Sequence, residues 1–159
     1  MIFNFKIILY LYVLIGFSIS KAGAFDDFFK AIVFDQVPVV ANLIYRGMDP
    51  NTPTDKGEPA LVFAVRSGAP QTVAYLLKQT GIRVDATNTA DETALMLAAN
   101  ANDIAVANLL IEAGASVNRP NWTPLHYAAS KGHLAMMHLL IDNDAYIDAE
   151  SPNGTTPLM

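Results

Sequence analysis

The chain has 159 residues, of which 52% are hydrophobic and 16% are charged, and its formal net charge is −5. This length suits a single domain that can bury a core. The absence of cysteine excludes disulfides, cysteine-ligated zinc and thiol catalysis. An isoelectric point of about 4.9 argues against a general nucleic-acid binder, which needs a basic face.

The beginning of the chain has the pattern of a secretory leader. A short start with one lysine precedes an apolar run over 7–17, and small residues follow at 22–24. This pattern predicts a signal peptide over 1–24 that is cleaved between Ala24 and Phe25. Cleavage would remove two of the ten basic residues and none of the fifteen acidic ones, so the mature charge would be −7. The alternative is an uncleaved membrane anchor, although a spanning helix needs roughly 20 apolar residues.

A repeated motif follows the leader. Its clearest copy is TPLHYAASKGH at 123–133, and weaker copies are TALMLAA at 93–99 and PALVFAV at 59–65. The sequence TPLM at 156–159 begins a further copy. The leucines of successive copies lie 34, 30 and 33 residues apart, a period that is typical of a solenoid.

Each copy contains the signals for two helices and a turn. Leu95, Ala98 and Ala99 share one face of the first helix, and the small alanines allow a second helix to approach closely. The second helix is predicted over 104–112, and Gly114 follows it, where a left-handed residue ends a helix. Proline near the start of a second helix, as at Pro38 and Pro70, costs no backbone hydrogen bond. Turns between units are predicted at 55–57 and 152–154.

The TPLH, GH and LL elements, together with unit ends such as GASVN at 114–118, resemble the ankyrin repeat family. The resemblance implies an all-α solenoid of stacked antiparallel helix pairs joined by β-turn fingers, with about four repeats and a truncated fifth. The ankyrin domain would cover 25–159, and its units are expected at about 25–51, 52–85, 86–118, 119–148 and 149–159.

Several positions depart from the family pattern. The first unit lacks TPLH, and its helices are expected around 26–35 and 38–46. It also carries a cluster of large aromatic residues at Phe25, Phe28, Phe29 and Phe34. The turn at 118–122 is about three residues short, which predicts a blunted finger. Glycine is replaced at two turn positions, by Asp91 and Asp144.

The other end of the chain also departs from the pattern, because it stops inside the first turn of a new helix. We expect an uncovered apolar side of the fourth unit that includes parts of Leu134, Met137 and Leu140. Truncation of a longer repeat protein is the leading explanation, and a partner or a second copy that completes the stack is the alternative.

Three histidines lie in the fourth unit, and the resemblance gives His126 and His133 structural roles. His138 is expected next to the core leucines, so a metal site is not favoured. Nucleophile elbow, P-loop and HExxH motifs are all absent from the sequence, and we expect neither catalysis nor a cofactor. Met136 and Met137 are interpreted as core residues.

The resemblance implies that the domain binds another protein through its finger tips and the concave face of its first helices. The positions that match are Lys56, Glu58, Arg66, Ser67, Asn88, Glu92, Asn100, Ala101, Trp122, Ser130 and Lys131. Trp122 is interpreted either as packing against the adjacent finger or as an anchor for the partner.

The sequence therefore predicts a non-catalytic interaction module that is exported to the periplasm or the outside of the cell, and a bacterial source fits best. Its partner would be a protein, without nucleic acid, and without a membrane after signal cleavage. A membrane-anchored scaffold that keeps 1–24 and a remnant of a longer ankyrin protein are the alternatives.

Overall fold

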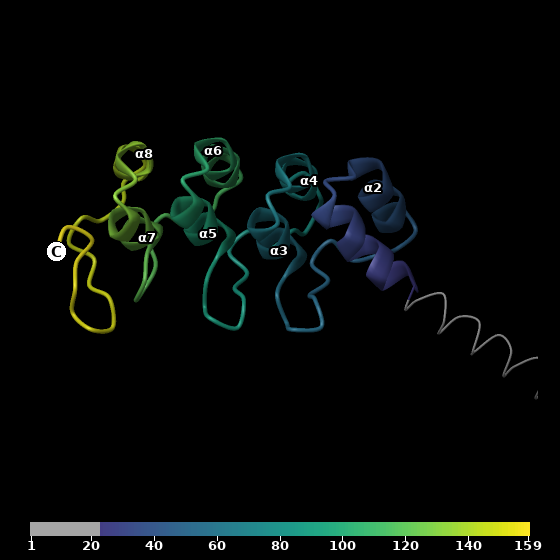
Figure 1. The fold of residues 1–159 in the computed structure, drawn as a ribbon, viewed down its shortest axis with the longest axis horizontal. Coiled ribbons are helices and arrows are strands. Elements are labelled where there is room, and N and C mark those ends of the chain that lie inside the picture. Colours follow the sequence, from purple (N-terminus) through teal and green to yellow (C-terminus); the bar gives the residue numbers. More distant parts are fainter. Residues whose placement is uncertain (1–22) are drawn as a thin grey trace, which may run out of the picture.

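A computed structural model describes residues 23–159 as a row of short helix pairs (Figure 1). The first helix occupies 23–33 of the described chain. The helices that follow are α2 (Val37–Tyr45), α3 (Ala60–Arg66), α4 (Pro70–Leu76), α5 (Ala94–Ala101), α6 (Ile104–Glu112), α7 (Pro124–Lys131) and α8 (Leu134–Asp142). These bounds lie within a few residues of the predicted ones.

The helices form two parallel rows. The inner row contains helix 23–33, α3, α5 and α7, and the outer row contains α2, α4, α6 and α8 (Figure 1). Helices α3, α5 and α7 pack on their own outer helices and on one another in order, and the outer helices contact one another less. The loops that join successive pairs project as fingers on the side away from the outer row. This arrangement confirms the predicted all-α solenoid.

Small and medium apolar residues fill the space between the rows. Ala64 and Ala98 of the inner helices are fully buried, as are Val73 and Leu110 of the outer helices. An alanine at the contact lets two helix backbones approach, and close packing then stabilises the pair without large side chains. Met136 lies in this core and Met137 packs against it, which confirms the interpretation of the two methionines.

The first unit is packed with aromatic rings in place of the TPLH motif. Phe29 makes edge-to-face contacts with Phe25 and with Phe28, at centroid distances of 4.9 and 5.3 Å. Phe28 is fully buried, whereas Phe34, which belongs to the same sequence cluster, is 70% exposed. Aromatic pairs in this geometry add to the burial of their surface, so the cluster replaces the local hydrogen bonds of a complete motif.

Side chains at the ends of the units connect neighbouring pairs. The amide of Asn51 accepts a hydrogen bond from Arg83 N at 2.8 Å and donates to Gly81 O at 3.0 Å. Asp85 accepts from Ser116 N at 2.9 Å, and Asn118 accepts from Tyr146 N at 2.8 Å. We call Asn51, Asp85 and Asn118 the Asx ladder. Each of these three residues ties the end of one unit to the end of the next.

A further link between units caps a helix. Asp35 accepts hydrogen bonds from Thr72 N at 2.7 Å and from Gln71 N at 3.2 Å. These amides belong to the first turn of α4, whose own N-cap residue, Ala69, has no side-chain acceptor. Because the first amides of a helix lack partners within the helix, the carboxylate of Asp35 caps α4 from the neighbouring unit.

The turn predictions agree with the backbone angles. Asp91 and Asp144 adopt φ of 58° and 64°, the left-handed conformation that glycine would have at these positions. The same conformation occurs at Asp35, Asn102 and Asn121, which the sequence did not single out. Asp and Asn tolerate it better than other residues because their side chains hydrogen-bond to nearby backbone.

The fingers differ in length as expected. Isolated β-bridges close two of them, between Pro53 and Pro59 and between Thr87 and Thr93. No such bridge is present among the described residues of the loop before α7, and this loop is visibly shorter in Figure 1. The missing residues of the turn therefore blunt the finger, as predicted.

At the end of the row, the prediction of an uncovered face is correct only in part. Leu134 is 68% exposed, but Leu140 is fully buried, so its predicted exposure is wrong. Leu140 occupies the register of Leu76 and Leu110, which are also fully buried core residues. It faces the interior of its own helix pair, and Leu134 does not.

Residues 1–22 of the predicted leader, which covers 1–24, lie outside the described residues. Ala24 and Phe25, on either side of the predicted cleavage point, are part of helix 23–33. Within residues 23–159, no helix combines the length and the hydrophobicity that crossing a membrane requires.

Candidate functional site

The predicted contact residues follow the inner helices and the fingers through three successive units. The exposed members are Lys56, Arg66, Asn100, Ala101, Trp122, Ser130 and Lys131. The half-buried members are Ser67, Asn88 and Glu92. Glu58 is buried, with 4% of its surface exposed. The set therefore contains exposed residues that can contact a partner and more buried residues that support the structure of the surface.

Glu58 holds Arg66. One carboxylate oxygen, Oε2, accepts a hydrogen bond from the Arg66 guanidinium, whereas Oε1 is buried and has no partner among the described residues. Burial raises the pKa of Glu58, and the positive charge of Arg66 opposes that rise. The guanidinium also lies over the ring of Phe63, with its central carbon 5.6 Å from the ring centroid, a favourable cation–π geometry. Glu58 and Phe63 thus fix Arg66 in place.

Glu92 plays a bridging role one unit further along. Its Oε2 accepts a hydrogen bond from Asn88 Nδ2 at 2.8 Å, and its Oε1 accepts one from the Tyr127 hydroxyl at 3.1 Å. Burial and the nearby charge of Glu92 raise the pKa of Tyr127 to about 12. The phenol therefore stays protonated and donates this hydrogen bond at any physiological pH. Glu92 links its finger to the next inner helix.

A strip of half-buried apolar side chains runs beside these polar groups. Its members are Phe29, Phe63, Leu97 and Tyr127, one from each inner helix. Phe29 and Phe63 meet edge to face, at a centroid distance of 5.3 Å. The sequence prediction missed this strip, although its signal is present: the last three lie two residues after the leucine of each motif copy.

The strip opens into a groove at the first unit. Helix 23–33, the finger before α3 and α3 itself surround a cavity of about 560 Å³. Phe25, Phe29 and Phe63 line this cavity, and Val33 and Phe34 also contribute to its apolar lining. We call this cavity the aromatic groove. It lies at the opposite end of the row from Trp122.

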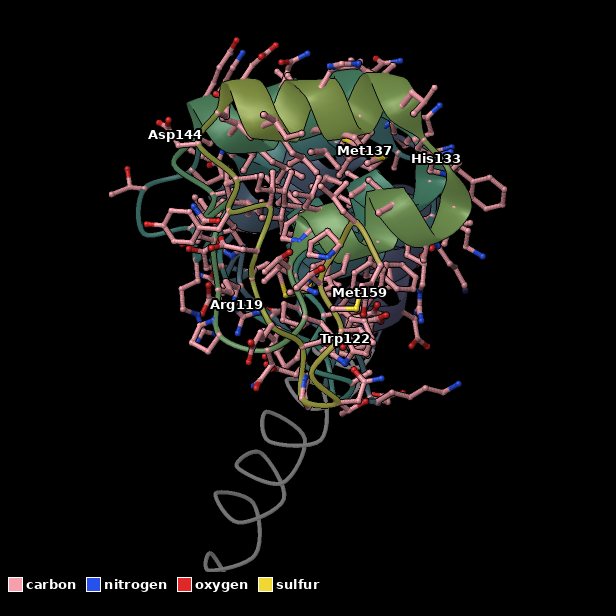
Figure 2. All side chains as sticks on the ribbon, turned by 90° about the vertical axis from the view of Figure 1, so that its left-hand side faces the viewer. Arg119, Trp122, His133, Met137, Asp144 and Met159 are labelled. Atoms are coloured by element: carbon pink, nitrogen blue, oxygen red, sulfur yellow. The ribbon has the colours of Figure 1, made fainter. Side chains whose placement is uncertain are left out.

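Trp122 stands at the blunted finger and is 43% exposed. Its ring contacts that of His126 edge to face, at a centroid distance of 5.3 Å. The indole therefore packs on its own unit and still presents a large apolar surface to solvent. Figure 2, which views the last unit end-on, places Trp122 in the lower part of this end. Packing of Trp122 against the adjacent finger and anchoring of a partner both stay predictions.

Two of the three histidines have the structural roles that were predicted. His126 Nδ1 pairs with the Thr123 hydroxyl at 2.8 Å, and Nε2 lies 3.2 Å from Thr155 O. His133 Nε2 lies 3.1 Å from Asn100 O in the preceding unit. His138 lies on α8 beside Leu139, as expected, and its side chain is exposed. Residues 23–159 contain no cluster of three or more side chains that could hold a metal ion.

Comparison with protein-family models gives two overlapping matches. A model described as ankyrin repeats in three copies matches residues 28–121, and one described as ankyrin repeats in many copies matches residues 110–158. Ankyrin repeats are in general a non-catalytic module that binds other proteins.

Individual relatives agree with the family models. Over 135 residues, or 80% of this chain, it is 30% identical to the nuclear factor NF-kappa-B p105 subunit of Gallus gallus. It is 31% identical over 142 residues, or 84% of the chain, to the phosphocholine transferase AnkX of Legionella pneumophila. It is 32% identical over 133 residues, or 80% of the chain, to the putative palmitoyltransferase ZDHHC13 of Danio rerio. These matches span only 14%, 15% and 20% of the three relatives. Because the family models and these relatives all match its repeats, the chain belongs to the ankyrin repeat family.

Proposed function

We propose that this chain is a non-catalytic, exported interaction module that binds a partner protein through its finger tips and the exposed side of its inner helices. The observation that carries the proposal is the row of exposed side chains on one side of three successive units. Lys56, Arg66, Asn100, Trp122 and Lys131 all belong to this row. A solenoid typically recognises partners with such an extended surface.

The chemistry of the same side supports binding over catalysis. Glu58 and Glu92 are engaged with Arg66 and Tyr127. His126 is engaged with Thr123 and with Thr155 O. The groups that could act as acids or bases therefore hold the surface together, and the exposed groups are those suited to contact.

The test of binding through this surface is partner capture: the wild-type chain and its variants are each used to recover the partner protein from the surroundings of the exported protein. Trp122→Ala and Lys131→Glu remove an apolar anchor and reverse a charge on the proposed surface. Lys78→Glu makes the same charge change at an exposed position that follows outer helix α4. We expect the first two variants to lower the recovery of the partner about tenfold, as loss of a hot spot does, and Lys78→Glu to leave it unchanged. Unchanged recovery with both surface variants would contradict the proposed surface.

The export part of the proposal rests on the leader pattern over 1–24. We propose that the mature protein acts in the periplasm or outside the cell, without nucleic acid and without a membrane, in a bacterial source. N-terminal sequencing of the protein recovered from cells is the direct check, and a product that begins at Phe25 is expected. A product that retains 1–24 would instead favour the membrane-anchored scaffold.

A further inference from the structure

The aromatic groove differs in charge from the rest of the surface. Residues 23–159 contain eight of the ten basic residues and all fifteen acidic ones. Three of those eight bases, Lys30, Lys56 and Arg66, line the groove, but only two of the fifteen acids, Asp26 and Asp55, do so. Glu58, which is paired with Arg66, adds a third acid beside it, so the groove is close to neutral in a domain that is otherwise strongly acidic. An anionic group is therefore repelled less here than elsewhere on the surface.

Arg66 is the best placed of the three bases. Its guanidinium has five N–H donors, and among the described residues it donates a single hydrogen bond, to Glu58 Oε2. The side chain is 55% exposed at the groove. Because Glu58 and Phe63 already fix its position, the remaining donors are available to a carboxylate at a reduced entropic cost.

The floor of the groove provides the apolar half of a binding site. The edge-to-face chain of Phe25, Phe29 and Phe63 offers ring edges and faces to a further ring. A volume of about 560 Å³ lies in the range of cavities that accept a large side chain or a small ligand. An aromatic side chain seated there would bury its surface and extend the existing ring contacts.

From these features we propose that the aromatic groove binds an acidic peptide segment of the partner, with one aromatic side chain on the Phe29–Phe63 floor and a neighbouring carboxylate on Arg66 and Lys56. This inference rests on the proposed function and specifies the partner's chemistry at the first two units. It is independent of Trp122 and Lys131, which lie in the fourth unit.

The test measures binding of fluorescein-labelled octapeptides to the full chain by fluorescence anisotropy. The probe carries one phenylalanine flanked by two aspartates in a glycine–serine background. Matched peptides replace either the phenylalanine with alanine or the aspartates with asparagine. We expect the probe to bind at least about tenfold more tightly than either matched peptide, and its binding to weaken as salt is raised.

Variants of the chain assign the binding to the groove. Lys56→Glu reverses a charge at an exposed position, and it should weaken binding of the probe peptide by about tenfold or more. Lys78→Glu makes the same change at an exposed position that follows outer helix α4, and it should have no effect. Arg66→Lys keeps the charge beside Glu58 but removes the planar fork, and it should also weaken binding. Circular dichroism checks that each variant keeps its helices.

Three outcomes would overturn the inference: equal binding of the asparagine peptide, equal effects of Lys56→Glu and Lys78→Glu, or no binding of any peptide. A dimer that Lys56→Glu abolishes in sedimentation analysis would also overturn it, because the occupant would then be a second copy. None of these results decides the proposed function, since partner capture through Trp122 and Lys131 can succeed when the groove fails. If partner capture fails while the probe peptide binds, the assignment of the groove as a peptide site stands, and the proposed wider binding surface is contradicted.

Discussion

The first two units and the last two units use different means to stabilise the same helix pairs. In the last two, side chains next to the helix start cap three of the four helices: Thr93 caps α5, Asp103 caps α6 and Thr123 caps α7, whereas α8 has no side-chain cap. Helices α2, α3 and α4 of the first two have no such side-chain cap. They depend on aromatic packing and on Asp35 acting from a neighbouring unit. A shared fold therefore does not imply a shared distribution of stabilising contacts.

The largest effect that would sharpen this comparison is expected from Phe28→Ala. Phe28 is fully buried in the aromatic cluster, so its truncation should cost about 3–5 kcal/mol of unfolding free energy. Phe34→Ala is the control, because Phe34 comes from the same cluster in sequence but is exposed, and it should change stability by less than about 0.5 kcal/mol. Urea denaturation measures both. Equal effects would mean that the cluster does not organise the first unit.

The next largest effect is expected from Asp35→Ala. It should lower the free energy of unfolding by about 1–2 kcal/mol, the usual cost of losing an acidic cap. Asp35→Asn keeps an oxygen acceptor and tolerates the left-handed backbone at this position, so it should retain much of the stability. Asp27→Ala, at an exposed position of the same unit, serves as the control for loss of charge. Thermal unfolding monitored by circular dichroism gives the three values. If Asp35→Ala is no worse than Asp27→Ala, the first two units do not depend on capping between units.

In the last two units, Thr123→Ala should cost about 1 kcal/mol, and Thr93→Ala somewhat less. Both hydroxyls accept a hydrogen bond from the third residue of their helix, but only Thr123 also pairs with a histidine ring. Its removal leaves His126 Nδ1 with a poorer partner in a buried position. Parallel urea titrations of the two variants measure the difference, and the reverse order would show that the His126 contact adds no stability.

The smallest effect concerns Glu58, and it depends on pH. The pKa of Glu58 is raised in the folded chain. The stability that Glu58 contributes is therefore fully present below its unfolded pKa, and it falls as pH rises through the folded pKa. Glu58→Gln removes this dependence, so its unfolding free energy relative to wild type should increase between pH 4 and pH 7. A constant or opposite difference would mean that the attraction of Arg66 outweighs burial.

The motif determined what the sequence could predict. TPLH-type copies, glycines and prolines encode local structure, so they predicted the helix pairs and the left-handed Asp91 and Asp144. Contacts between units have no local signal. The hydrogen bonds that Asp35 accepts from α4 join residues more than 30 positions apart, and in the sequence Asp35 looks like an ordinary end of a helix.

The candidate surface was predictable to the same extent. Lys56, Arg66, Trp122 and Lys131 are exposed as their positions in the motif implied. The burial of Glu58 was not predicted, because it depends on how the finger folds over α3 and on Arg66 eight residues away. The aromatic groove was also missed, since it forms only when helix 23–33 packs beside α3.

The Asx ladder has a mechanical consequence. Asn51, Asp85 and Asn118 each connect one unit to the next, and none of their hydrogen bonds skips a unit. Force applied along the row would pass through these connections in series, so the weakest one would set the extension at which the row begins to open. A partner bound across several units would carry part of that force in parallel. Binding along the finger side would thus raise the resistance of the whole row to stretching, without any change in the fold of a single helix pair.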